Sequence, residues 1–274
     1  MTIPNGLWIR MFIVHENKNF IPIFVINLLR SSARRVSIEG QAKNLGITVK
    51  FIEAIDGEEI SDVKSVGYDR RANRREYGRL LTKGEIGCYA SHISAAKAFI
   101  ATKEKYAIIL EDDASIDEDF LYFYQNALDV LGVIEQDMKL VNLCKVSAPS
   151  KRSSEIVHSL QHSISFYETY EFPTVARGIM WSRNGAAEFL KNGSVIAKPV
   201  DHFFKDWLTR NKGGYCLGNA VVKGMGFTSD IGSGTTRGKL KMIEAIRHDI
   251  ARGKRDLIND LNILKRKFKA RYDK

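Results

Sequence analysis

The chain has 274 residues, of which 44% are apolar and 27% charged, a composition that indicates an ordinary soluble globular protein of one or two domains. Three widely spaced cysteines with no CxxC pair favour reduced thiols in a cytoplasmic protein over a disulfide framework or a zinc site. The longest apolar run, at 21–29, is too short to span a bilayer. The net charge of +10 is concentrated at 237–274, where 13 Lys/Arg stand against 5 Asp/Glu, which indicates an anionic surface as the partner of that segment.

The first predicted strand and helix suit a phosphate or nucleotide ligand. Residues 21–28 (IPIFVINL) are typical of a buried strand, with Asn27 as a polar interruption near its end. A serine and three arginines open the helix that follows: Arg30, Ser31, Arg34 and Arg35. Such residues at a helix start bind phosphate well, although a capped helix with solvated arginines explains the pattern equally well.

After a second predicted strand at 47–55, residues 61–79 carry many arginines and almost no apolar periodicity. This composition predicts a mobile loop, which could fold over an anionic donor or form a solvated surface. A helix over 83–100 comes next, and Thr82 and Glu85 have the spacing of a capping box. His92 lies in mid-helix, one turn from Cys88, and is either a ligand-contacting or a structural histidine.

The strongest signal is the segment KYAIILEDD at 105–113. Residues 106–110 are a short apolar run typical of a buried strand in a parallel sheet, and Glu111, Asp112 and Asp113 follow at its end. Open α/β sheets bind their ligands at the carboxyl ends of their strands. Three adjacent carboxylates repel one another, so the cluster favours a bound Mn²⁺ or Mg²⁺ over a solvated acidic turn.

The second half of the chain alternates predicted helices and strands. A helix is expected over 117–131 and another from Ser182 to Leu190, with strands at 140–144, 164–170 and 174–181. Asp201 stands at the start of a further helix, where it is expected either to cap that helix or to act as a rigidly held general base.

The tail at 237–274 predicts a long amphipathic helix. Its apolar residues recur at steps of three, four and seven: Ile243, Ile246, Ile250, Leu257, Leu261, Leu264 and Phe268. This stripe, with the basic residues around it, fits a helix lying on anionic lipid. It equally fits packing on the catalytic domain or on a second subunit.

Four segments resemble glycosyltransferase family 25, whose bacterial members build lipooligosaccharide. They occur in the family's order: FVINLLRSSARR at 24–35 with AIDG at 54–57, LTKGEIGCYASHISAAKAF at 81–99, YAIILEDDA at 106–114 and PVDHFF at 199–204. The resemblance implies an α/β fold of the GT-A type, with a mostly parallel central sheet flanked by helices. The expected division is an N-terminal extension at 1–20, a catalytic domain at 21–236 and a basic helical tail at 237–274.

The resemblance also implies a metal-assisted, inverting transfer of a hexose, galactose above all, from a UDP-sugar to a terminal sugar of lipooligosaccharide. The acidic motif of the family stands here as Glu111-Asp112-Asp113, with Asp113 and Glu111 as expected metal ligands. Asp201 is the expected base, with Asp112 and Asp230 in reserve. Further contacts to the donor are expected from the following side chains: Asn27, Arg30, Arg34, Arg35, Glu111 and His92.

Two other classes of protein remain open at this point. A metal-dependent phosphoryl-transfer enzyme or nuclease would also use acids after a strand, but the chain has no P-loop. A nucleic-acid-binding module would use the basic tail, yet aromatic and basic residues are not interleaved there, and no nucleic acid is expected. The expected location is the cytoplasm, including peripheral attachment to the inner face of the inner membrane. The expected partner of the tail is either that membrane surface or a second copy of the chain.

Overall fold

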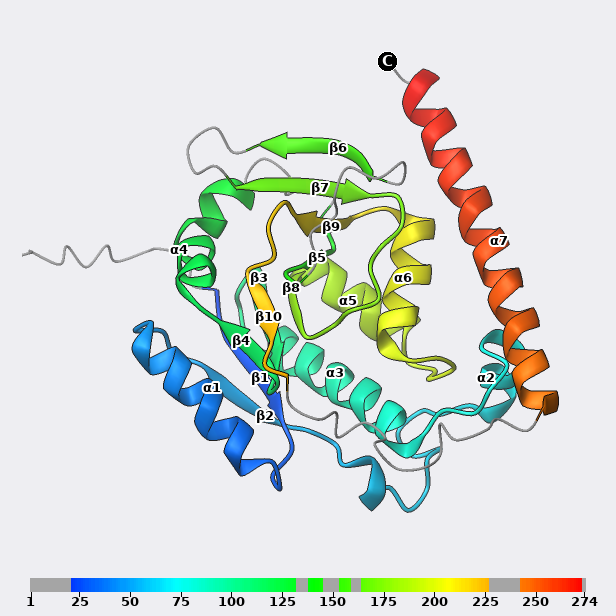
Figure 1. Cartoon of the computed structure of the whole chain (residues 1–274), viewed down its shortest axis with the longest axis horizontal. Coiled ribbons are helices and arrows are strands. Elements are labelled where there is room, and N and C mark those ends of the chain that lie inside the picture. The colour runs from blue at the N-terminus through cyan, green and yellow to red at the C-terminus, as the bar shows by residue number, and fades with distance from the viewer. Residues whose placement is uncertain (1–20, 132–137, 145–152, 159–163, 227–241, 273–274) are drawn as a thin grey trace, which may run out of the picture.

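The computed structural model describes residues 21–131, 138–144, 153–158, 164–226 and 242–272 (Figure 1). The strands in these ranges are β1 (Ile23–Asn27), β2 (Lys50–Glu53), β3 (Tyr106–Glu111), β4 (Ala114–Ile116), β5 (Leu140–Asn142), β6 (Ser153–His158), β7 (Ser165–Thr169), β8 (Gly178–Ser182), β9 (Gly214–Leu217) and β10 (Val222–Gly224). The helices are α1 (Ser32–Asn44), the 3-10 helix η1 (Gly57–Glu59), α2 (Arg70–Glu76), α3 (Lys83–Ala101), α4 (Glu118–Leu131), α5 (Arg183–Asn192), α6 (Val200–Asn211) and α7 (Met242–Tyr272).

Eight of these strands form one sheet in the order β2-β1-β3-β8-β5-β9-β7-β6, and β4 pairs separately with β10. β1 runs parallel to β2 and β3, and β5 runs parallel to β9, whereas the other neighbours are antiparallel. The α/β class is confirmed, and the sheet is mixed where a mostly parallel one was expected. The difference begins at β8, which lies antiparallel between β3 and β5. A fully buried strand has the same apolar run in either direction, so the sequence does not reveal this reversal.

Both faces of the sheet are covered by helices (Figure 1). Side chains alternate between the faces along each strand. Phe24 and Ile26 of β1 therefore pack in the core under α3, α5 and α6, while Ile23 and Val25 pack under α1 and α4. With both faces filled by apolar side chains, polar groups concentrate where the strands end.

The start of α3 confirms the predicted capping box, since Thr82 and Glu85 each accept the other's backbone N–H, at 3.1 and 2.9 Å. The predicted loop at 61–79 is wrong in part, because it contains α2. Asp69 caps the first turn of α2, and Asn73 is fully buried and donates to a backbone carbonyl. Because polar groups anchor this helix, it leaves no apolar period in the sequence.

The tail helix α7 docks on α2 and α6 through a mostly polar face. Arg255 donates to the carbonyl of Glu76 at 2.6 Å, and Asn259 donates to Asp206 at 2.8 Å. Arg266 is buried and donates to the carbonyls of Leu208 and Thr209 at the end of α6, and to the Glu168 carboxylate at 2.8 Å. The inner face of α7 is formed by His248, Ala251, Arg255, Asn259, Ile263 and Arg266.

The predicted apolar stripe of α7 lies on the solvent-exposed side of the helix. Its seven side chains, from Ile243 to Phe268, are 50–67% exposed. The expectation that the stripe packs on the catalytic domain is therefore wrong, because polar anchors turn the opposite face inward. A membrane surface and a second subunit stay predictions. Among the described helices none has the length and apolar character needed to cross a bilayer. The expected extension at 1–20 and the boundary at 236 fall outside the described residues.

Arg266→Met tests the docking of α7. The change leaves the carbonyls at the end of α6 and the Glu168 carboxylate without their cation, which should lower the free energy of unfolding by roughly 3–5 kcal/mol. Lys269→Met on the exposed side of the same helix should change it by less than about 0.5 kcal/mol. Urea unfolding that gives equal values for the two variants would contradict the buried anchor.

Candidate active site

The parallel strands β1, β2 and β3 end side by side, and their last residues define the carboxyl edge of the sheet. Asn27 pairs in register with Glu53, and Ile26 pairs with Glu111. Glu111, Asp112 and Asp113 follow one another here, yet their carboxylates have three different sets of partners. The cluster is therefore three sites with different chemistry.

Asp112 is a buried structural carboxylate. Its Oδ2 accepts a hydrogen bond from the Asn27 side chain at 2.7 Å, and its Oδ1 accepts one from Arg34 at 3.0 Å. The residue is 6% exposed, so both oxygens are occupied within the protein. We infer that Asp112 ties β3 to β1 and α1 and is poorly placed to act as the reserve base. Asn27 and Arg34, expected to contact the donor, hold Asp112 in the described structure.

Glu111 points toward α3. Its Oε1 lies 3.1 Å from Nε2 of the buried His92 and 3.9 Å from the thiol of Cys88. Burial alone would raise the pKa of Glu111, but the hydrogen bond with His92 and the charges of Arg177 and Arg34 bring it below its ordinary value. Glu111 is therefore ionised at neutral pH. Nδ1 of His92 has no hydrogen-bond partner among the described residues.

Asp113 pairs with an arginine that sequence analysis did not single out. Arg177 donates to Oδ1 of Asp113 at 3.0 Å, and both side chains are partly exposed. Burial, together with the nearby charge of Glu111, raises the pKa of Asp113 even though Arg177 acts against this. Arg177 precedes β8, and only the antiparallel pairing of β8 with β3 brings it to the carboxyl edge.

The donor set at this edge fits a divalent cation. The ligand atoms of Cys88, His92 and Glu111 lie within 4.8 Å of one another, the one such group among the described residues. Burial raises the pKa of the Cys88 thiol well above its ordinary value, so the thiol keeps its proton and is a poor ligand. Glu111 and His92 remain as the pair that would hold the ion. Asp113 lies outside this group of three residues. Its carboxylate could reach the ion only after its ion pair with Arg177 breaks.

Asp201 lies in the first turn of α6, two positions after the N-cap residue Pro199, so the expectation that Asp201 caps this helix is wrong. One carboxylate oxygen accepts the backbone N–H of His202 at 2.8 Å. Burial, reinforced by the charges of Glu111 and Glu85, raises the pKa of Asp201 from 3.8 to about 6. A carboxylate with this pKa is a stronger base than an ordinary aspartate and is still mostly ionised at neutral pH. The second reserve base, Asp230, falls outside the described residues.

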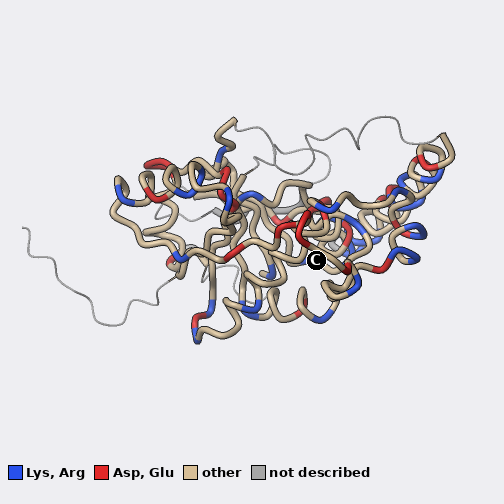
Figure 2. The backbone as a smooth tube through the Cα atoms, turned by 90° about the horizontal axis from the view of Figure 1, so that it is seen from below, with Lys and Arg blue, Asp and Glu red and all other residues tan. Residues whose placement is uncertain are grey.

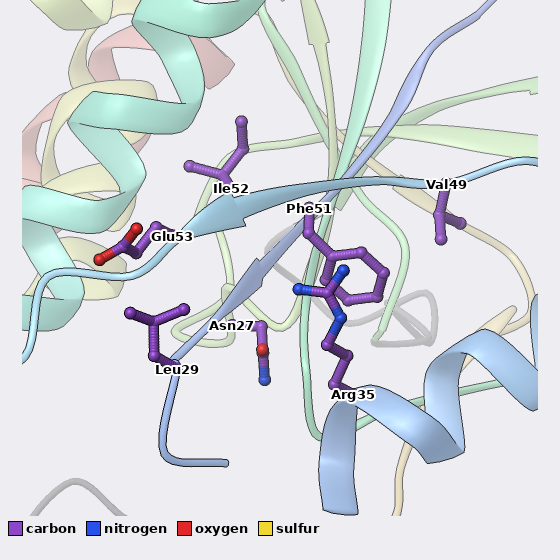
Figure 3. Close-up of a pocket in the computed structure, with 7 residues that line it drawn as sticks. All are labelled: Asn27, Leu29, Arg35, Val49, Phe51, Ile52 and Glu53. Carbon is purple, nitrogen blue, oxygen red and sulfur yellow. The ribbon is translucent and has the colours of Figure 1, made fainter. Parts of the chain in front are cut away.

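An open cleft of about 420 Å³ lies beside the carboxyl edge, between β2 and the start of α1 (Figure 3). The guanidinium of Arg35 stacks over the ring of Phe51 at 4.1 Å, and the side chain of Asn27 lies at the same cleft. The full lining is Asn27, Leu29, Arg35, Val49, Phe51, Ile52 and Glu53. Arg30 forms an ion pair with Asp56 instead. Phe51 was not predicted as a site residue, although an aromatic on a half-buried strand could have suggested it.

Comparisons with known proteins match the part of the chain that holds these residues. Residues 20–204 match the family described as Glycosyltransferase family 25 (LPS biosynthesis protein), a range that includes every predicted site residue except the reserve base Asp230. Procollagen galactosyltransferase 2 of Homo sapiens is 27% identical over 198 residues, which is 69% of this chain and 30% of that protein. A glycosyltransferase 25 family member of Drosophila pseudoobscura pseudoobscura is 30% identical over 187 residues, 65% of this chain and 28% of that protein.

The chain thus spans less than a third of the length of these relatives. Among solved structures, a glycosyltransferase involved in the glycosylation of the major capsid of PBCV-1 aligns over 85% of this chain and 98% of its own, with 10% identity and a TM-score of 0.41.

The raised pKa of Asp201 has a consequence for stability that needs no substrate. The folded protein holds the proton more tightly than the unfolded chain, so this stabilisation is complete below pH 3.8 and is lost as the pH rises to about 6. Asp201→Asn resembles the protonated form. Its free energy of unfolding relative to the parent should increase between pH 4 and 6 and stay level above. A difference that does not vary with pH in urea titrations would refute the shift.

Proposed function

The chain belongs to glycosyltransferase family 25, and from this premise we propose that it transfers galactose from UDP-galactose to a terminal sugar of a lipooligosaccharide acceptor, with inversion at the anomeric carbon. The observation that carries the proposal is Asp201, a partly buried carboxylate with a raised pKa whose charge interacts with that of Glu111 at the carboxyl edge. Such a pair separates the two tasks of the reaction. Glu111 serves the leaving group, and Asp201 serves the attacking hydroxyl.

The cleft beside β2 is the proposed site for the uridine. The face of Phe51 and the apolar side chain of Val49 suit a flat base, while Arg35 offers hydrogen-bond donors. The cleft lies next to the carboxyl ends of β1 and β2, where open sheets bind nucleotides. The diphosphate would then point along the edge toward Glu111, with Arg30 and Arg177 as nearby cations.

The acidic side chains support a divalent ion in the proposed reaction. Glu111 and His92, joined by Asp113, would hold Mn²⁺ or Mg²⁺. When bound, the ion stabilises the negative charge that develops on the diphosphate as it leaves. Asp112 would keep the acidic turn rigid through Asn27 and Arg34, so that the carboxylates on either side keep their orientation.

Asp201 is the proposed general base. The oxygen of the acceptor hydroxyl forms a bond to the anomeric carbon while the bond from that carbon to the diphosphate oxygen breaks. The hydroxyl proton passes to Asp201, and the diphosphate leaves with the electron pair of the broken bond. A single displacement of this kind inverts the anomeric centre and needs no covalent intermediate.

The proposed sugar and the proposed acceptor come from different comparisons. The description of the family names LPS biosynthesis, whereas the human relative is a procollagen galactosyltransferase by name. Galactose as the transferred sugar is supported by the relative's name and by the sequence resemblance, and lipooligosaccharide as the acceptor is supported by the family description. The proposed location is the cytoplasmic face of the inner membrane, where a lipid-linked acceptor would be available.

Asp113→Ala tests the metal role. The carboxylate is partly exposed and forms its ion pair with Arg177, so the variant should fold normally and lose the Mn²⁺-dependent part of UDP-galactose binding in calorimetry. Asp119→Ala is the matched control, since this carboxylate is 72% exposed and belongs to the first turn of α4. Parental binding of both donor and Mn²⁺ by Asp113→Ala would remove Asp113 from the metal site.

Asp201→Asn tests the base. The amide keeps the oxygen that accepts the His202 N–H but cannot take a proton, so kcat should fall by ~10²–10⁴-fold while donor affinity is retained. For the parent enzyme, kcat/KM should rise with pH to a plateau with an apparent pKa near 6. Near-parental kcat in the variant, or a flat profile in the parent, would rule Asp201 out.

A further inference from the structure

The outer face of α7 carries a continuous apolar surface. Eight large side chains, each at least half exposed, form this outer stripe: Met242, Ile243, Ile246, Ile250, Leu257, Leu261, Leu264 and Phe268. In Figure 1, α7 lies at the margin of the domain, and no described element covers its outer side. Apolar patches of this extent on a soluble domain mark an interaction surface.

The stripe has a fixed orientation because the polar inner face holds the helix. Arg255, Asn259 and Arg266 are buried against α2 and α6 and lie on the opposite side of the helix from Ile250, Leu257 and Leu264. Turning the stripe inward would move these three polar side chains out to solvent and break their hydrogen bonds to α2 and α6. A partner must therefore come to the stripe from outside the domain.

Charges beside the stripe are separated by sign. At 3.6 residues per turn, Asp249, Asp256 and Asp260 flank one side, while Arg247, Lys254 and Lys265 flank the other, and all six side chains are exposed. Figure 2 shows basic residues in blue and acidic residues in red along α7. When two such helices pair in parallel, the acidic flank of one meets the basic flank of the other, and Asp249 faces Lys254 of the second copy. An antiparallel pair would place aspartates near aspartates.

The same charges disfavour a lipid surface. An interfacial helix carries lysines and arginines on both sides of its apolar face, where they meet anionic headgroups. Here the flank from Asp249 to Asp260 is acidic, with Lys267 as its first basic residue, and the segment from Met242 to Leu264 has four basic and four acidic residues. Only the last turns of the helix are strongly basic.

We propose that the outer stripe of α7 pairs in parallel with the same stripe of a second copy of this chain, so that the protein is a two-fold symmetric dimer. A standard interface buries roughly 800 Å² per partner, and eight exposed side chains of this size supply apolar surface of that order. Gly253 lies within the stripe, and a Cβ there would meet no described atom within 4 Å. Its own chain does not require this glycine, whereas a closely approaching second helix would use the space.

Sedimentation velocity of the full chain tests the proposal. The parent should sediment at twice the monomer mass of 31.0 kDa. The double variant Ile250→Glu, Leu257→Glu should be a monomer with an unchanged circular dichroism spectrum, because both side chains are exposed. Lys269→Glu, on the exposed surface beside the stripe, should remain a dimer. A parent that is monomeric at tens of micromolar, or a double variant that stays dimeric, overturns the proposal.

Two further arms separate the possible partners and the orientation. Leu264→Cys should form an intermolecular disulfide under mild oxidation and the parent should not, because equivalent residues meet along the whole of a parallel pair but only at the centre of an antiparallel one, and Leu264 lies away from the centre of α7. A dimer without this cross-link overturns the parallel arrangement.

Flotation with vesicles of phosphatidylcholine and phosphatidylglycerol tests whether the stripe binds a lipid surface. Vesicle binding by a protein that is monomeric in solution, lost in the double variant, would assign the stripe to the membrane instead.

Discussion

The buried carboxylate of Asp112 is the constraint on which the candidate active site depends. Asn27 and Arg34 hold both of its oxygens, so the end of β3 is fixed to the end of β1 and the start of α1. Because successive side chains on an extended chain point to opposite sides, fixing Asp112 directs Glu111 the other way, toward His92. Three adjacent acids thus become one structural group and two groups with partners of their own, Glu111 with His92 and Asp113 with Arg177.

The second constraint connects the base to the tail helix. His202, next to Asp201, contacts the ring of Tyr77 at 5.2 Å, and Tyr77 contacts His248 of α7 at 4.9 Å. Arg255 of α7 also stacks over Tyr77, at 4.8 Å. The position of Asp201 therefore depends on α7 being docked. A helix that looks like an appendage in the sequence supports the proposed catalytic machinery.

The sequence predicted much of this, and the exceptions have physical causes. Strand and helix positions followed from apolar periodicity, and the Thr82–Glu85 capping box was confirmed. Pairing direction was not predictable, because β8 is buried on both faces; hence Arg177, which reaches Asp113 only through that pairing, was missed. Asp112 was indistinguishable from its neighbours until its burial was known. The stripe of α7 was predicted correctly, but which face docks depended on polar anchors such as Arg266, which look like solvent-exposed residues in a sequence.

The central claim is that the carboxyl edge of the sheet moves a hexose from a nucleotide sugar with inversion. The most direct measurement is UDP release from a panel of UDP-sugars, with and without oligosaccharides that end in galactose, glucose or N-acetylglucosamine, followed by NMR of the product. The account predicts that an acceptor stimulates release from UDP-galactose and that the new linkage is β. An α-linked product, or no acceptor-stimulated release from any UDP-sugar in the panel, would contradict it.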